Sequence, residues 1–358
     1  MDLHIVGGFL GSGKTTAIIN AAKVLMGEGK RVGVVTNDQG KYLVDTAFFH
    51  SAAIPAVEVT GGCFCCNYDD LDVRLAQLGE AAQPEVIFAE SVGSCADIVA
   101  TVVKPLLALR APDTATPRSF SVFVDARLLH RRLLNLPMPF SDEVIYLFDK
   151  QIEEAGMLII NKRDLLSLAD AHKVLALAET AFTGISLRLQ NSLETREVVG
   201  WVNALTSGGA KPPLEPLDID YRRYGSGEAA LAWLDETLIF RVPDGAGRGI
   251  VCRFAEALLA GIERRDLAIG HVKLLISAGD VSAKVSWATL AADWRDLVPD
   301  LPGDRVSVLL NARVETDATE LHRLVEEALA LAAREADVEA DRVAYFHPSF
   351  PNPTHRMA

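Results

Sequence analysis

The sequence lacks several features that would place it in a broad class of protein. It has no apolar run long enough to span a bilayer. Its first residues, Met1 to His4, do not form the basic segment that begins a signal peptide. Basic residues are fewer than acidic ones, which gives a net charge of −13. This charge argues against a broad surface for binding nucleic acid or an anionic membrane. We therefore expect a cytoplasmic protein with neither nucleic acid nor membrane as a partner.

Cysteine is scarce and unevenly placed. Of the five cysteines, Cys63, Cys65 and Cys66 fall within four positions, preceded by two glycines. This is not the spacing of a disulfide framework, and in a cytosolic protein such clustering indicates metal or redox chemistry. Cys95 and Cys252 each stand among small or apolar neighbours, and we interpret both as ordinary buried cysteines.

A glycine-rich segment follows the first apolar run. Residues 7–16 read GGFLGSGKTT and open into a helical pattern, which fills the pattern GxxxxGK[ST] in its proper context. Glycines let successive N–H groups point at one anion, and the helix amino terminus adds its dipole. We expect Lys14 to reach the β- and γ-phosphates and Thr15 to ligate Mg²⁺. The nucleotide-binding residues predicted in this P-loop are Gly8, Gly11, Ser12, Gly13, Lys14, Thr15 and Thr16.

Apolar strand-like runs alternate with helical patterns up to about residue 205. Such alternation predicts an α/β fold with a mostly parallel sheet, whose ligands bind at the carboxyl ends of the strands. We predict a P-loop NTPase domain over residues 1–205, a linker over 206–235, and a smaller α+β domain with a largely antiparallel sheet over 236–358. The first domain's strands are expected at 3–6, 31–36, 86–89, 120–124, 157–160 and 185–189, and its helices at 15–26, 69–80, 96–108, 142–154 and 169–182.

Two carboxylates follow expected strands. Glu90 follows 86–89, and Gly93 comes three residues later, which matches the DxxG arrangement of small GTPases with Glu in place of Asp. We expect Glu90 to face Mg²⁺ and to act with Lys14 in catalysis, and the Gly93 N–H to meet the γ-phosphate. Asp38 follows the second strand and either approaches Mg²⁺ or a second metal, or caps a turn.

The residues Asn161, Lys162 and Asp164 form the motif NKxD directly after an expected strand. A carboxylate at this place accepts hydrogen bonds from N1–H and the 2-amino group of guanine, a donor pair that adenine lacks. The motif therefore predicts selection of GTP. Ser192 lies where the last base-contacting loop of such a protein is expected.

Three thiolates can converge on one ion only if the backbone bends sharply, and Gly61 and Gly62 permit that bend. Thiolates suit Zn²⁺ and similar ions, and a tetrahedral site needs a fourth ligand from elsewhere. Redox switching is the competing interpretation of Cys63, Cys65 and Cys66. The proline-rich C-terminal tail carries His347 and His355, which are either metal ligands or parts of a docked or loose segment.

The P-loop, the GGCFCC run, ExxG and NKRD occur here in this order, which resembles the CobW-type metallochaperone GTPases, relatives of the HypB and UreG nickel chaperones. The resemblance covers about residues 1–205. It implies GTP hydrolysis coupled to delivery of a transition metal such as Zn²⁺ or Co²⁺ to a client metalloenzyme or cofactor-assembly protein, with Cys63, Cys65 and Cys66 as ligands. The oligomeric state, including a homodimer, stays open. Many members have a histidine-rich run; this chain has none.

Two alternatives stand beside a GTP-hydrolysing metallochaperone. One is a GTP-gated activator of a cofactor enzyme, for example one that uses cobalamin, in which the thiols hold a structural metal. The other is a metal sensor that binds GTP and seldom hydrolyses it. For the metallochaperone, GTP hydrolysis by the chain alone is expected to be slow. There is no evident arginine finger, and Gln39 is only a weak candidate for positioning the attacking water.

Overall fold

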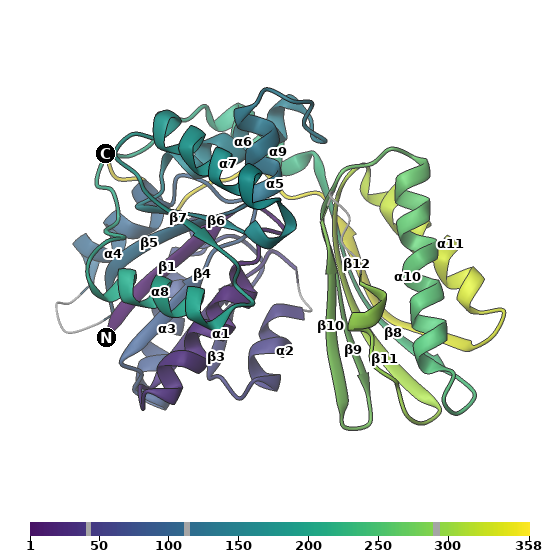
Figure 1. The fold of residues 1–358 in the computed structure, drawn as a ribbon. Coiled ribbons are helices and arrows are strands. Elements are labelled where there is room, and N and C mark those ends of the chain that lie inside the picture. Colours follow the sequence, from purple (N-terminus) through teal and green to yellow (C-terminus); the bar gives the residue numbers. More distant parts are fainter. Residues whose placement is uncertain (41–43, 111–114, 289–293) are drawn as a thin grey trace. The chain divides into compact units, whose positions relative to one another are not determined.

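The computed structural model describes residues 1–40, 44–110, 115–288 and 294–358. The chain divides into two compact units. The first comprises Met1–Gln39, Asp45–Glu228 and Phe350–Ala358, and the second comprises Gly40–Val44 and Ala229–Ser349. Each unit has its own sheet (Figure 1). The C-terminal residues thus belong with the first unit, although the sequence suggested that they end the second domain.

The first unit is built on a seven-stranded sheet in which the neighbouring strands run parallel, in the order β3-β2-β4-β1-β5-β6-β7. Because the strands are parallel, their carboxyl ends meet along one edge. That edge gathers the motifs predicted from the sequence. The strands are β1 (Asp2–Gly8), β2 (Val32–Asn37), β3 (Ala56–Val59), β4 (Val86–Glu90), β5 (Thr116–Asp125), β6 (Met157–Asn161) and β7 (Ser186–Gln190).

Helices cover both faces of this sheet. On one face α1 and α8 lie side by side (Figure 1). Trp201 of α8 is fully buried there, packs edge-on against Phe123 and donates from its indole N–H to Ser121 at 3.1 Å. The helices are α1 (Lys14–Gly27), α2 (Val44–Ser51), α3 (Tyr68–Ala82), α4 (Lys104–Leu109), α5 (Ala126–Leu133), α6 (Asp142–Glu153), α7 (Leu168–Ala181), α8 (Thr195–Thr206) and α9 (Tyr221–Ala229).

The second unit is a five-stranded antiparallel sheet, in the order β10-β9-β11-β8-β12, with α10 and α11 on one face (Figure 1). Alternate residues of β9 and β11 are buried under these helices, as a sheet covered on one face requires. The elements are β8 (Leu231–Arg241), α10 (Gly247–Arg264), β9 (Ile269–Ala278), β10 (Val281–Trp287), β11 (Arg305–Glu315), α11 (Ala318–Ala332) and β12 (Asp337–Phe346).

The predicted fold class is confirmed: a parallel α/β sheet with a P-loop, followed by an antiparallel α+β unit. The edge strand β3 was not predicted, because four residues are too few to carry a clear pattern. Residues 221–229, which fall in the range expected as a linker, form α9 in the structure.

The helix expected over 96–108 is interrupted. Residues Val99–Val103 form a π-turn, and α4 begins only at Lys104. In a π-turn each N–H bonds the carbonyl five residues back, and Pro105 has no N–H to offer Ala100. The Met357 N–H instead donates to the Ala100 carbonyl at 2.9 Å. A residue near the C-terminus therefore completes this interrupted helix.

Candidate nucleotide and metal site

The P-loop has the tight geometry that its glycines predict. Gly8 and Gly13 have φ of 120° and 91°, and Gly13 caps α1. A Cβ on Gly8 would lie 2.1 Å from the Phe123 carbonyl oxygen, and one on Gly13 would lie 2.5 Å from Asn161 Nδ2. Side chains are thus excluded by both backbone conformation and space. Lys14 Nζ folds back over the loop and donates to the Gly8 carbonyl at 2.7 Å.

A hydroxyl and a carboxylate meet beside this loop. Thr15 Oγ1, at the start of α1, donates to Glu90 Oε1, at the end of β4, over 2.8 Å, and both side chains are buried. Both are oxygen ligands of the kind that Mg²⁺ takes, so these residues fit that ion. Gly93 packs against the P-loop: a Cβ there would lie 2.7 Å from the Leu10 side chain.

Asp38 lies just past β2, where its N–H donates to the Val59 carbonyl at 3.3 Å. Burial is the main cause of the raised pKa of Glu58, and the charge of Asp38 raises that pKa further. A role for Asp38 at Mg²⁺ stays a prediction.

Asn161 joins three loops of the site. Its Nδ2 donates to the Ser12 carbonyl at 2.7 Å, and its Oδ1 accepts from the Ser192 N–H at 3.1 Å and hydroxyl at 2.8 Å. Lys162 adopts a left-handed conformation, and its Nζ lies 3.2 Å from Asp125 Oδ2. The predicted P-loop, NKxD and Ser192 segments are thus brought together.

Asp164 is exposed and lines a hollow of about 490 Å³. Its carboxylate is therefore accessible at the strand edge that carries Asn161. The rest of the lining is mixed in polarity, with Arg163, Leu166, Leu168, Ala171, His172 and Leu189.

The three clustered cysteines follow the edge strand β3, and their sulfur atoms all lie within 4.8 Å of one another. The Sγ–Sγ distances are 2.7 Å between Cys63 and Cys65, 3.3 Å between Cys63 and Cys66, and 3.8 Å between Cys65 and Cys66. Zinc with Zn–S bonds of about 2.3 Å would separate its sulfur ligands by about 3.8 Å. The thiols fit such an ion after an expansion of about 1 Å or less along the shorter edges.

The amide of Asn37 shapes this loop. Its Nδ2 donates to the carbonyls of Val59 and Gly62 at 3.1 and 2.8 Å, and its Oδ1 accepts from the Phe64 N–H at 2.8 Å. Because Asn37 ends β2, the thiol loop is anchored to the sheet edge that also carries the P-loop.

Hydrogen bonds among the clustered thiols shift their pKa values in opposite directions. Hydrogen bonding with Cys65, and then with Cys66 and Cys95, holds the pKa of Cys63 well below its ordinary value. The same contacts with Cys63 raise the pKa of Cys65, and raise that of Cys66 to about 11. The neighbouring thiols thus favour the charged form of Cys63.

Cys95 is a buried free cysteine, as expected from the sequence. Burial is the main cause of the raised pKa of its thiol.

The C-terminal tail is docked beside the cysteines. Asn352 N–H donates to Cys66 Sγ at 3.3 Å, and Thr354 bonds the Cys65 and Cys66 carbonyls at 2.9 and 3.0 Å. His355 packs edge-on against Tyr68, with 5.0 Å between ring centroids. In the described part of the chain, neither tail histidine joins the thiol cluster. Sequence reasoning missed this contact, since prolines alone do not indicate where a tail docks.

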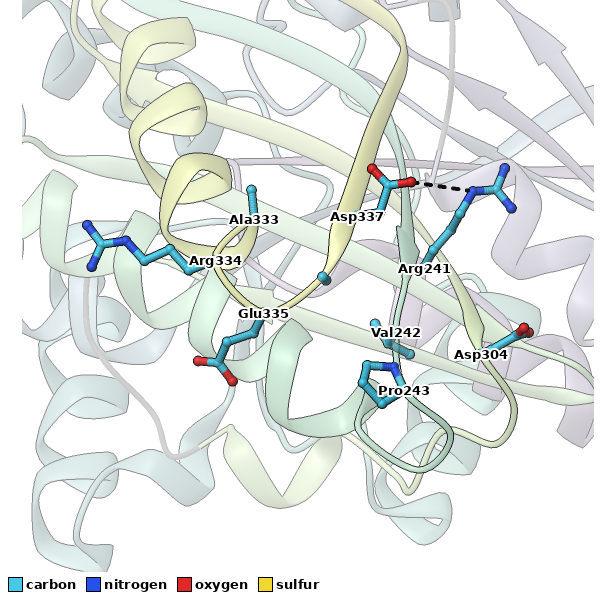
Figure 2. A pocket seen from close by; sticks show the side chains of 9 residues that line it. Arg241, Val242, Pro243, Asp304, Ala333, Arg334, Glu335 and Asp337 are labelled. Atoms are coloured by element: carbon cyan, nitrogen blue, oxygen red, sulfur yellow. Dashed lines mark ion pairs between the residues drawn. The ribbon is translucent and has the colours of Figure 1, made fainter.

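The second unit contains a separate hollow of about 610 Å³ between the ends of β8 and α11 (Figure 2). Arg241 pairs with Asp337 at 4.0 Å, while Arg334 extends to the opposite side. None of the predicted site residues lines this hollow. The residues predicted to bind nucleotide and metal all belong to the first unit.

Residues 2–184 match the family model described as CobW/HypB/UreG, nucleotide-binding domain. Among curated proteins, the chain is 29% identical over 187 residues to the zinc chaperone CobW of Sinorhizobium sp, covering 45% of this chain and 51% of that protein. It is 30% identical over 166 residues to the zinc chaperone YeiR of Escherichia coli (strain K12), covering 45% and 46%. The chain therefore spans about half the length of the curated relatives it matches.

Solved structures of similar proteins include HypB from Helicobacter pylori in complex with nickel, with 16% identity, a TM-score of 0.39, and coverage of 58% of this chain and 86% of that one. A Zn(II)-bound triple mutant of the YjiA GTPase has 14% identity, a TM-score of 0.40, and coverage of 93% and 98%. Among the described residues, no helix has both the length and the apolar character needed to cross a membrane.

Proposed function

The chain belongs to the CobW/HypB/UreG family, and from this premise we propose that it is a GTP-hydrolysing metallochaperone. Its nucleotide state would control the binding and release of a transition metal, zinc or a similar ion such as Co²⁺, at Cys63, Cys65 and Cys66. The metal is the cargo, and a client metalloenzyme or cofactor-assembly protein receives it.

One observation carries this proposal: the thiol cluster and the nucleotide motifs lie on the same edge of one sheet. Asn37 at the end of β2 holds the thiol loop, and Glu90 at the end of the adjacent β4 holds Thr15 of the P-loop. Ordering of these segments by a γ-phosphate would therefore change the geometry around the sulfur atoms.

The chain's own residues have defined parts in hydrolysis. Lys14 would leave the Gly8 carbonyl for the phosphates, and the Gly93 N–H would face the γ-phosphate. Thr15 and Glu90 would hold Mg²⁺, which neutralises charge between the β- and γ-phosphates. Asp164 would accept from the guanine base, supported by Asn161 and Ser192. Slow hydrolysis without a partner is part of the proposal.

A second candidate is an activator of a cofactor enzyme with a structural metal. The burial of Cys63 and Cys65, with 2% and 1% of their surface exposed, favours it. A closed site of this kind is typical of structural zinc.

The two candidates differ in the coupling between metal and nucleotide. We would titrate Zn²⁺ against a chelating competitor with a non-hydrolysable GTP analogue bound, and again with GDP. The chaperone requires affinities that differ by about 5- to 150-fold, and metal must then shift the preference for GTP over GDP by the same factor. Lys14→Ala is the matched variant, in which the nucleotide effect should vanish and metal binding remain. Equal affinities with both nucleotides would favour the structural site.

A further inference from the structure

The C-terminal tail, Phe350–Ala358, belongs to the first unit and is held there at two places on either side of its middle. At its start, Phe350 packs closely on α9, where a Cβ added to Gly225 would lie 2.1 Å from the phenylalanine ring. Near its end, Arg356 Nε donates to the buried carboxylate of Asp97 at 2.8 Å. The residues between these two contacts therefore follow a fixed course over the first unit.

The middle of the tail runs along the thiol loop. The Asn352 N–H donates to Cys66 Sγ at 3.3 Å. The Thr354 N–H donates to the Cys65 carbonyl at 2.9 Å, and the Thr354 hydroxyl donates to the Cys66 carbonyl at 3.0 Å. Pro353, between them, has no N–H to donate. The tail thus bonds both the backbone of the thiol loop and one of its sulfur atoms.

The sulfur atom that the tail reaches belongs to the most accessible of the three clustered cysteines. Cys63 and Cys65 have only 2% and 1% of their surface exposed, whereas Cys66 is half-buried. An ion bound by the three sulfur atoms is therefore expected to enter and leave on the side of Cys66. The backbone of Asn352 lies on that side.

We propose that the tail is part of the metal site and controls exchange of the ion: the Asn352 N–H stabilises the Cys66 thiolate, and the tail must detach before the ion leaves. This inference rests on the proposed function, because it concerns the same cargo. A hydrogen bond to a charged acceptor is stronger than one to a neutral acceptor, so loss of the Cys66 proton on metal binding strengthens the contact with the tail.

The tail acts on the site in two ways that can be separated. The Asn352 N–H bonds a metal ligand itself, and removal of a group that bonds a ligand typically costs about 10- to 100-fold in metal affinity. Thr354 bonds only the backbone of the loop, so it holds the tail in place without changing the electron density on sulfur. Both contacts slow release of the ion, and only the first changes the metal–sulfur bond.

The test uses the full-length protein, purified anaerobically with a reductant and loaded with Zn²⁺ or Co²⁺. In Asn352→Pro, which lacks the N–H, zinc affinity should fall about 10- to 100-fold and transfer of zinc to a colorimetric chelator should be at least about 10-fold faster. The sulfur-to-cobalt charge-transfer band should move to lower energy, because a thiolate that loses a hydrogen bond donates electrons more readily. Asn352→Ala is the matched variant: it keeps the N–H and should retain the wild-type rate and spectrum.

Thr354→Val removes the hydroxyl and nearly preserves the volume of the side chain. Zinc transfer to the chelator should be several-fold faster, with the charge-transfer band in its wild-type position. Thr354→Ser, which keeps the hydroxyl, should restore slow transfer. Thr180→Val, at an exposed position on α7, is the control outside the tail and should change neither quantity.

Two results would overturn the role of the tail and leave the proposed function intact. One is an Asn352→Pro protein that binds GTP as the wild type does and also has the wild-type zinc transfer rate and cobalt spectrum. The other is unchanged zinc transfer in Arg356→Ala, which frees the far end of the tail and decides the question if Asn352→Pro does not fold. A wild-type protein that binds no zinc, or one whose binding survives Cys63→Ser, would overturn the proposed function itself.

Discussion

Two buried amides hold together the loops that carry the predicted site residues. Asn161 ties the P-loop to the Ser192 loop, and Asn37 ties β2 to the thiol loop. Each amide uses both its donor and its acceptor, so an aspartate of the same shape could not replace either one. Neutral groups thus hold in place the loops that are predicted to position phosphate, base and metal.

Asp164 is the residue on which base selection is expected to depend. In Asp164→Asn, one acceptor for guanine becomes a donor, so GTP affinity should fall and xanthosine triphosphate should become the preferred ligand. Each lost hydrogen bond to the charged carboxylate costs about 1.5–3 kcal/mol. Calorimetric titration with GTP, ATP and xanthosine triphosphate measures the change, with Asp280→Asn in the second unit as control. Equal affinity of the wild-type protein for GTP and ATP would contradict the role of Asp164.

Glu154 makes folding stability depend on pH. It is buried, its Oε2 accepts from the Val99 N–H at 3.2 Å, and burial raises its pKa well above the ordinary value. Between the pKa of an unfolded glutamate, about 4.3, and this raised value, the folded state binds the proton and the unfolded state does not. This contribution is therefore fully present below that window, and stability falls as pH rises through it.

Replacement of this ionisable group by a neutral one should weaken the dependence of the free energy of unfolding on pH. Relative to the wild-type protein, Glu154→Gln should be more stable at pH 8 than at pH 5, with a slope change of up to about 1.4 kcal/mol per pH unit inside the window. Urea unfolding at a series of pH values gives the free energies. The exposed neighbour Glu153→Gln is the control. Parallel profiles for wild type and Glu154→Gln would mean that Glu154 ionises freely in the folded protein.

At the scale of elements, the tail residues Phe350–Ala358 act as a strap across the first unit. They bond the thiol loop at Asn352 and Thr354 and the interrupted helix at Met357. Between these points, Arg356 Nε donates to the buried Asp97 at 2.8 Å, and Asp97 also accepts from the Tyr221 hydroxyl at 2.6 Å. The strap thus connects the loop after β3 with the segment after β4.

Loosening the strap should expose one thiol selectively. Arg356→Ala removes the contact with Asp97, so Cys66, which lies under Asn352, should react several-fold faster with a thiol reagent in the metal-free protein. Cys63 and Cys65 should keep their slow reaction because the loop itself buries them. Mass spectrometry of the modified peptides resolves the sites, and the exposed Arg222→Ala is the control. Faster reaction at all three thiols would indicate general unfolding of the loop instead.

At the scale of the whole molecule, each unit has a core of its own. The apolar side chains of β8–β11, α10 and α11 form one cluster, and α1, α8 and the parallel sheet form another. The nucleotide and thiol groups belong to the first unit alone. Binding of a nucleotide is therefore expected to stabilise the first unit against unfolding more than the second.

Amide hydrogen exchange can measure this difference. GTP with Mg²⁺ at 100 times its dissociation constant should slow exchange in the core of β1 and β4 by an amount that corresponds to about 2.7 kcal/mol. Amides in the middle of β8 and β11 should change much less. The Lys14→Ala variant should lose the effect. Equal added protection in both units would mean that they open as one cooperative body.

Some features of this protein follow from the sequence alone. The P-loop, ExxG and NKRD are contiguous patterns, and each is set by backbone conformation within a few residues. Alternating strand and helix patterns then predicted a parallel α/β sheet, and hence one edge where these motifs meet. The thiol cluster was predicted for the same reason, since Cys63, Cys65 and Cys66 are neighbours in the chain.

Other features were decided only by the tertiary structure. Asn37 bonds residues of the loop beyond Val59, and Asn352 reaches Cys66 from near the other end of the chain. Each contact depends on which strands are neighbours and on how a loop packs, and no local pattern encodes either. The π-turn before Pro105 and α9 were missed because packing and distant hydrogen bonds stabilise them more than local propensity does, whereas β3 was too short to carry a clear pattern.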